Sequence, residues 1–289
     1  MKKITITAPA KINLTLDVKG RRPDGFHDIE SIMHQIDLVD EVVISEIPQG
    51  ICLDGSNLQL SYDNSNLAYR AAKLLLEIYG IKKGVNIFLA KNIPLGAGLA
   101  GGSTNAASVL KGINRLFELN INERDMLTLA GKLGSDVPFC LLGGTAVASG
   151  KGEILTPVIN RNKLNFLLVN PGFAVSTADI YELMDREIIT DRPDIDKVVT
   201  DLAENYVPGI GTSMANVMEP VTFRMFPELK EIKNELLKGK AAGVIMSGSG
   251  PTIFALFADA EEAREDYNKM KLKYPLTFLC SSYINESLT

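Results

Sequence analysis

Histidine and cysteine are scarce in this chain, and long apolar runs are missing. The 289 residues include two histidines, His27 and His34, and three cysteines, Cys52, Cys140 and Cys280. Without a cysteine cluster or a His-Glu-x-x-His sequence, a zinc site has little support, and we predict no metal ligands supplied by the protein. Three widely spaced cysteines suit free thiols in a reducing cytoplasm rather than a disulfide framework.

No apolar run approaches the roughly 18 residues that a membrane span requires. The basic start of the chain is not followed by the long apolar segment of a signal peptide, so we expect a cytoplasmic protein without a membrane partner. A net charge of −5 gives no general attraction to nucleic acid, and we expect no such partner. With 46% hydrophobic residues, the chain is long enough to form two compact domains.

A glycine-rich stretch at residues 94–105, PLGAGLAGGSTN, lies between a predicted strand and a predicted helix. Apolar residues alternate before it (Val85, Ile87, Leu89) and recur at helical spacing after it (Ala106, Leu110, Ile113, Phe117). Exposed N–H groups and the helix dipole meet at such a helix start, which suits a phosphate. Ser103 or Thr104 could add a hydroxyl donor. The simpler alternative is a glycine-rich turn that only caps the helix.

Several well-known phosphate-binding motifs do not fit this stretch. Gly96, Gly98 and Gly101 have the G-x-G-x-x-G spacing, but no acid follows a second strand as a dinucleotide fold requires. The lysine of a Walker A motif is missing, and no His-Arg-Asp or Asp-Phe-Gly triplet of a protein kinase occurs. The fuller pattern P-x-x-x-G-L-x-G-G-S-x-N-A-A resembles the phosphate loop of the galactokinase, homoserine kinase, mevalonate kinase and phosphomevalonate kinase superfamily.

Three further segments carry candidate residues for catalysis or ligand binding. Residues 12–18 alternate as a strand, so that Lys11 and Asn13 point the same way, although a lone strand lysine is usually solvated. The turn at residues 21–27 contains Phe26 beside His27, a pair that alone would more often be core packing. Asp136 directly follows a predicted helix and could simply cap the next one.

The remaining pattern predicts an α+β fold with two domains, 1–159 and 160–275, because the apolar pattern breaks around residues 159–162. We expect helices that begin at Ser65 or Asn66, at Asn122 and at Ser176 or Thr177, and further helices and strands along the second half. Predicted segments are helices at 194–203, 227–238 and 260–271, and strands at 42–47, 165–169, 243–246, 252–257 and 277–284.

Motifs along nearly the whole chain resemble one branch of the superfamily, the 4-(cytidine 5′-diphospho)-2-C-methyl-D-erythritol kinases. They are residues 8–14, 22–27, 134–139 and 247–251, with a looser match at 216–220. The resemblance implies a kinase that transfers the γ-phosphate of ATP to the C2 hydroxyl of the erythritol unit. It also implies an N-terminal domain like domain 2 of ribosomal protein S5 and a ferredoxin-like C-terminal domain. Residues 276–289 would return to the first domain.

The resemblance also assigns roles by position. Asp136 corresponds to the catalytic base, in contact with the substrate, and Lys11 to its partner near the transferred phosphate. The ATP phosphates would lie against Pro94, Gly96, Ala97, Gly98, Leu99, Ala100, Gly101, Gly102, Ser103 and Thr104. Asn66 and Lys91 would contact adenosine, and Asn13, Phe26, His27 and Tyr181 the cytidine diphosphate end. Mg²⁺ would be held mainly by the ATP phosphates.

Two other functions compete with this hypothesis. Another small-alcohol kinase of the superfamily, for mevalonate or homoserine, would have no cytosine to bind, so the Phe26–His27 turn counts against it. A nucleotide-binding regulatory or RNA-associated protein would suit an S5-like domain. The net charge and the missing basic cluster argue against that class.

Overall fold

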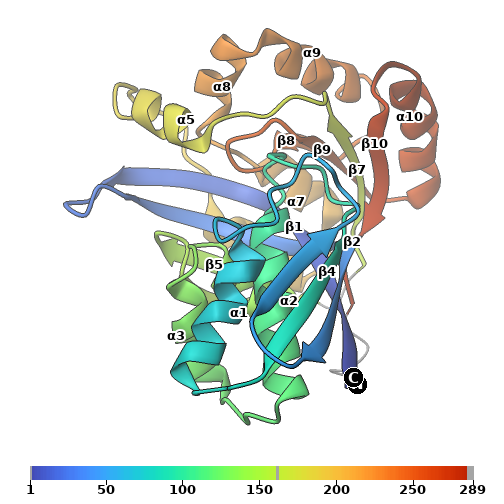
Figure 1. Ribbon diagram of the computed structural model, residues 1–289. Helices are drawn as coiled ribbons and strands as arrows, with labels where there is room; N and C mark the ends of the chain where they lie inside the picture. The colour runs from blue at the N-terminus through green and yellow to red at the C-terminus, as the bar shows by residue number, and fades with distance from the viewer. Residues whose placement is uncertain (1, 161–162, 285–289) are drawn as a thin grey trace. The chain divides into compact units, whose positions relative to one another are not determined.

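The computed structural model describes residues 2–160 and 163–284 and consists of mixed strands and helices (Figure 1). Contacts divide the chain into two compact units. Unit 1 contains the described residues of 1–10, 38–95 and 100–143, and unit 2 those of 11–37, 96–99 and 144–289. Two long strands, β1 (Lys3–Arg21) and β2 (His27–Ile47), contribute residues to both units.

Unit 1 packs helices on a small sheet. Its elements, besides parts of β1 and β2, are β3 (Ile51–Gly55), α1 (Leu67–Ile78), β4 (Gly84–Ala90), α2 (Gly101–Leu116), α3 (Glu123–Gly131) and α4 (Val137–Leu142). Strand β4 pairs with β2 in antiparallel and with β3 in parallel fashion. Val85, Ile87 and Leu89 of β4 are buried in one core with α1 and α2, which lie side by side (Figure 1). The predicted alternation of β4 is therefore confirmed.

Polar cap residues explain where two of these helices begin. The Asn66 side chain accepts a hydrogen bond of 2.9 Å from the Ala68 N–H at the start of α1. Asn122 accepts one of the same length from the Asp125 N–H at the start of α3. Both caps satisfy a backbone donor that the first helical turn leaves unpaired. The sequence predicted Asn122, and it predicted Asn66 as one of two alternatives with Ser65.

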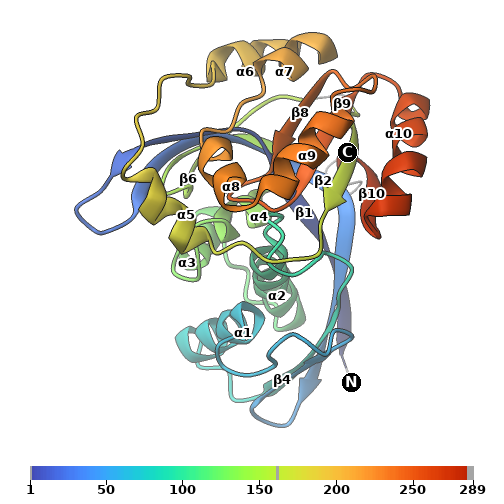
Figure 2. The same cartoon turned by 90° about the horizontal axis from the view of Figure 1, so that it is seen from above.

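Unit 2 is built on an antiparallel sheet of strand order β10-β7-β9-β8. Its elements are β5 (Thr145–Gly150), β6 (Ile154–Pro157), β7 (Asn165–Asn170), α5 (Thr177–Met184), α6 (Ile195–Ala203), α7 (Val207–Ser213), α8 (Glu219–Met225), α9 (Pro227–Leu236), β8 (Gly243–Met246), β9 (Ile253–Phe257), α10 (Ala260–Lys273) and β10 (Leu276–Ser281). Phe166, Phe254 and Phe257 fill the core of the sheet, and α9 and α10 pack against it (Figure 2). The α+β prediction is confirmed.

The predicted domain limits stay a prediction. The expected boundary at residues 159–162 lies partly outside the described residues, as does the end of segment 276–289. Strand β10 pairs with β7, and the N–H of its last residue, Ser281, donates to Asp37 of β2 at 2.7 Å. Within the described part of the chain, no helix has the length and apolar character needed to cross a membrane.

A buried histidine makes unit 2 sensitive to acid. The His34 ring hydrogen-bonds through Nδ1 to Thr145 Oγ1 at 2.7 Å and through Nε2 to Ser282 Oγ at 3.0 Å. Burial lowers the pKa of His34 from 6.5 to about 4, because the charged ring loses its hydration. The unfolded chain therefore binds this proton before the folded chain does. The stability that the neutral ring provides is complete above pH 6.5 and is lost as the pH falls toward 4.

We expect this histidine to make the free energy of unfolding fall by about 2 kcal/mol between pH 6.5 and pH 5. Urea unfolding at both pH values would measure the fall in the native chain and in His34→Gln. The variant should lack this part of the pH dependence while keeping the part due to carboxylates. Equal slopes in the two proteins would show that His34 is not the group responsible.

Candidate active site

The predicted phosphate loop connects β4 to α2. Ala100, immediately before the helix, has a left-handed conformation with φ of 56° and provides no side-chain cap. The first turn of α2, which the structure describes fully, contains no acidic side chain. Unpaired N–H groups and the positive end of the dipole of this 16-residue helix therefore remain for an anion.

The loop requires glycine at position 98. Gly98 has a φ of 74° and Gly96 has a φ of 60°. L-residues rarely adopt this left-handed region of the backbone. A Cβ atom on Gly98 would also lie 2.3 Å from the Ser247 carbonyl oxygen. Both conformation and space therefore exclude a side chain from this point of the loop.

A second glycine-rich loop, residues 247–251, contacts the first within unit 2. The Ser247 hydroxyl donates to the Gly98 carbonyl at 2.9 Å. The buried Asn216 amide donates to the carbonyls of Met246 at 2.8 Å and Gly248 at 2.7 Å, which fixes the second loop. Two segments that match the family motifs, residues 216–220 and 247–251, are therefore joined by hydrogen bonds. The second of them also contacts residues 96–99.

Thr104, in the first turn of α2, has a side chain that suits a ligand. The residue is 1% exposed, and its Oγ1 makes no hydrogen bond to any residue that the structure describes. A buried hydroxyl normally has a partner. An incoming phosphate oxygen or bound water would supply one, so the predicted hydroxyl donor fits a site for ATP.

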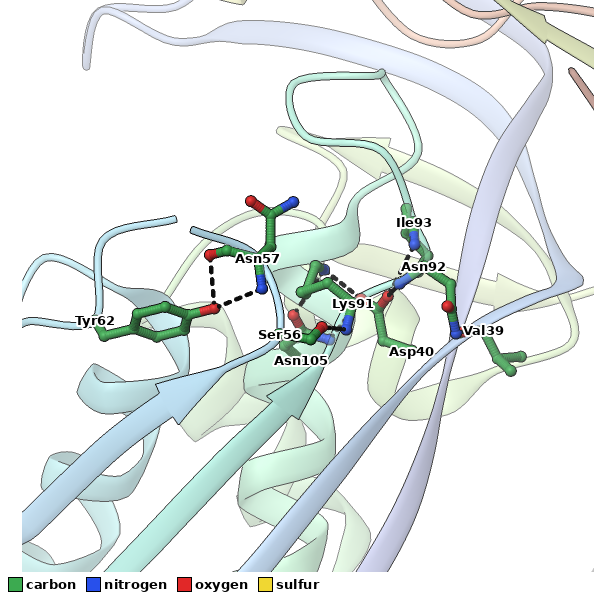
Figure 3. Close-up of polar contacts among 9 residues, drawn as sticks. All are labelled: Val39, Asp40, Ser56, Asn57, Tyr62, Lys91, Asn92, Ile93 and Asn105. Carbon is green, nitrogen blue, oxygen red and sulfur yellow. Dashed lines mark hydrogen bonds and ion pairs between the residues drawn. The ribbon is translucent and has the colours of Figure 1, made fainter. Parts of the chain in front are cut away.

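The two residues expected near adenosine already have structural partners in unit 1. Asn66 caps α1 and also donates from Nδ2 to the Ser61 carbonyl at 2.8 Å. Lys91, next to the end of β4, has a side chain only 2% exposed that forms an ion pair with Asp40 and donates to Asn105 Oδ1 at 2.9 Å (Figure 3). Their contact with adenosine stays a prediction.

Asp136 precedes α4, the short helix that packs on α2. Its side chain makes no capping hydrogen bond to α4, a helix that the structure describes completely. Asp136 therefore occupies the N-cap position of α4 without a capping hydrogen bond from its side chain. Its role as the proton acceptor stays a prediction.

Lys11 lies on β1, beside the phosphate loop within unit 2. Its backbone N–H donates to the Leu99 carbonyl at 3.1 Å, and its Nζ donates to Asn13 Oδ1 at 2.6 Å. Asn13 in turn donates from Nδ2 to Ser31 Oγ at 2.8 Å. Lys11 is 4% exposed, so the alternative of a solvated lysine is wrong. The polar face of β1 is buried, which is costly unless its groups are paired or used.

The turn before β2 brings aromatic and polar groups together. The His27 ring stacks on Tyr181 of α5, with centroids 4.7 Å apart and planes inclined by 21°. Phe26 is 53% exposed, so core packing does not explain it, and the Lys151 ammonium lies 4.6 Å from its ring centre. The sequence predicted Phe26, His27 and Tyr181 but gave no indication of Lys151.

Asp185, which follows α5, is a second residue that the sequence did not reveal. The His27 ring donates from Nε2 to Asp185 Oδ1 at 2.7 Å, and Arg21 pairs with the other oxygen at 3.2 Å. The hydrogen bond from His27 holds the pKa of Asp185 below its ordinary value. This hydrogen bond orients the His27 ring through Nε2 and leaves Nδ1 as its second polar atom.

Two family models match this chain, and together they cover more than half of it. The model for the GHMP kinases N terminal domain matches residues 66–144, and that for GHMP kinases C terminal matches residues 190–276. The chain is thus an ATP-dependent small-molecule kinase of the GHMP class, as the sequence predicted.

Individual relatives show to which family within this class the chain belongs. The 4-diphosphocytidyl-2-C-methyl-D-erythritol kinase of Syntrophomonas wolfei is 42% identical over 98% of this chain and 99% of its own length. A crystal structure of 4-(cytidine 5′-diphospho)-2C-methyl-D-erythritol kinase matches with a TM-score of 0.84 and 34% identity, over 98% of this chain and all of that one. The chain belongs to the 4-diphosphocytidyl-2-C-methyl-D-erythritol kinase family. A homoserine kinase from Cytophaga hutchinsonii, with a TM-score of 0.77 and 24% identity over 99% of this chain and 96% of its own, shares the fold.

Proposed function

We propose that this chain transfers the γ-phosphoryl group of ATP to the C2 hydroxyl of 4-diphosphocytidyl-2-C-methyl-D-erythritol, in the non-mevalonate route to isoprenoid precursors. The observation that carries the proposal is the 42% identity, over 98% of the chain, to a kinase named for this substrate. Its partners would be small molecules. We also propose a cytoplasmic location, which the free thiols of Cys52 and Cys280 suit.

In the proposed mechanism, Asp136 accepts the proton of the C2 hydroxyl while the hydroxyl oxygen attacks the γ-phosphorus. A bond forms between that oxygen and phosphorus, and the bond from phosphorus to the bridging oxygen of ADP breaks. Lys11 stabilises the charge on the transferred group, because a cation held in a dry site acts strongly on it. The buried position of Lys11 supports this role.

The ATP phosphates would bind at the loop that ends at α2. The uncapped helix start and the unpartnered Thr104 hydroxyl support this position, since both offer donors to an anion. Mg²⁺ would accompany ATP and be held mainly by phosphate oxygens and water, where it neutralises phosphate charge.

The cytidine end of the substrate would bind at the turn around His27. Tyr181 and Phe26 offer aromatic surface for a flat base, and Asn13 offers an amide. The hydrogen bond from His27 to Asp185 orients the ring, whose Nδ1 is a second polar atom available to the edge of a cytosine base. This chemistry supports a cytidine ligand.

Measuring ADP release with a panel of alcohols tests the substrate assignment. The cytidyl substrate should give turnover well above that with mevalonate or homoserine at equal concentration. Preferred turnover of mevalonate or homoserine would replace the assignment with another small-alcohol kinase. No ADP release with any of them would remove the support for this substrate class.

Replacing Tyr181 by Ala should raise the Michaelis constant for the cytidyl substrate roughly 5- to 150-fold, because a base–aromatic stack is worth about 1–3 kcal/mol. Steady-state kinetics with each substrate varied in turn would measure it, and the constant for ATP should change little. Tyr206→Ala is a matched control, since Tyr206 is an exposed tyrosine at the start of α7. Unchanged constants for both substrates in Tyr181→Ala would contradict the stacking role.

A further inference from the structure

A buried carboxylate, Asp40 of β2, connects the two ends of the phosphate loop (Figure 3). Its Oδ1 accepts the N–H groups of Asn92 at 2.7 Å and Ile93 at 2.9 Å, immediately before the loop. Its Oδ2 accepts from the Asn105 amide at 2.9 Å, on the first part of α2, and from the Lys91 ammonium. All these groups belong to unit 1.

These bonds make residues 94–100 a closed loop. Asn92 and Ile93 precede it, and Asn105 lies one helical turn after Gly101, where α2 begins. Lys91 also donates to Asn105 Oδ1 at 2.9 Å, so Asp40, Lys91 and Asn105 contact one another in a ring. We call these three residues the loop clamp.

The charges of the clamp matter because of what lies next to it. A Cβ atom added to Gly101, the first residue of α2, would lie 3.3 Å from Lys91 Nζ. The helix start is where the ATP phosphates are proposed to bind. Asp40 is 0% exposed, and a buried carboxylate here would repel phosphate unless a cation cancels its charge. Lys91 supplies that cation.

We propose that the loop clamp positions the phosphate loop for ATP, and that Lys91 acts by neutralising Asp40 rather than by contacting the nucleotide. Asp40 and Asn105 are positioning residues, not catalytic ones. The proposal rests on the proposed function of the loop as the ATP site. The family resemblance instead implied that Lys91 contacts adenosine. The two possible roles of Lys91 can be distinguished by replacing Lys91 and Asp40 together.

The decisive variant is Lys91→Met combined with Asp40→Asn. In this pair the buried charges are removed together, and the oxygen of the substituted amide can still accept the N–H groups of Asn92 and Ile93. The Asn105 amide can rotate so that its oxygen accepts from the new amide group. Calorimetric titration with ATP should therefore give a dissociation constant within a few-fold of the native value. Loss of ATP binding in this double variant would overturn the proposal in favour of a direct contact by Lys91.

The single Lys91→Met variant should bind ATP roughly 10- to 100-fold more weakly, because it leaves the Asp40 carboxylate buried without its cation. The Michaelis constant for the cytidyl substrate should stay near the native value, whereas general damage would raise both constants. Should this single variant not fold, the double variant decides alone. Lys197→Met is a matched control, since it also removes the cation from a buried carboxylate, that of Asp201, on helix α6. It should leave ATP binding unchanged.

These outcomes separate the clamp from the proposed function. If native protein releases ADP with the cytidyl substrate while Lys91→Met binds ATP normally, the clamp fails and the function stands. If native protein binds ATP but phosphorylates no cytidyl substrate, the substrate assignment fails, and the ATP titrations of the variants still test the clamp.

Discussion

The Asp136→Asn variant should turn over about 10²- to 10⁴-fold more slowly than the native chain while it binds ATP with similar affinity. An amide has the shape of the carboxylate but cannot accept the proton of the substrate hydroxyl. Because Asp136 makes no capping hydrogen bond to the fully described helix α4, the change should cost the helix little. We therefore expect the variant to lose rate in the chemical step.

Single-turnover kinetics and calorimetric titration with ATP would measure the two quantities separately. Asp194→Asn is a matched control, because Asp194 does cap a helix, through a hydrogen bond of 3.0 Å from the Lys197 N–H, and asparagine caps equally well. Its turnover should equal that of the native chain. A normal rate in Asp136→Asn would mean that the proton leaves by another route.

Lys11→Met should lower the turnover number by about 10²- to 10³-fold, the effect of removing one preorganised group that stabilises transition-state charge. The side chain is 4% exposed, so water would replace the lost ammonium poorly. Methionine fills a similar volume, and Asn13 keeps its hydrogen bond to Ser31. The Michaelis constant for the cytidyl substrate should change less than the turnover number does.

A thermal melt alongside the kinetics distinguishes catalysis from folding. Lys19→Met serves as the control, since Lys19 lies on the same face of β1 but has a side chain 46% exposed. It should keep its activity, because Arg192 still pairs with Asp17. A Lys11→Met variant that is active until it melts at a much lower temperature would make the lysine structural.

Much of the fold could be predicted because its signals are local. Apolar spacing and cap residues predicted α1, α3 and β4, and the predicted strand at 243–246 coincides with β8. Three missed helices, α4, α7 and α8, have proline in their first turn. Proline is tolerated there because its missing N–H needs no partner, yet in a short segment it resembles a helix breaker.

The candidate site was less predictable because its partners are distant in sequence. Asp40 lies 51 positions from Lys91, and Asp185 lies 158 from His27, so no local pattern links either pair. The alternation of β1 separated polar from apolar faces but could not show that the polar face is buried as well. Only tertiary contacts give that information.

The closure of the phosphate loop by Asp40 has a consequence for the entropy of nucleotide binding. Ordering a flexible backbone costs roughly 1–2 kcal/mol per residue in conformational entropy. Hydrogen bonds to one carboxylate, from Asn92 and Ile93 at one end and Asn105 at the other, hold the two ends of the loop together in the folded chain. The entropy cost of bringing these two ends together then belongs to folding, and under the proposed function ATP would not have to supply it.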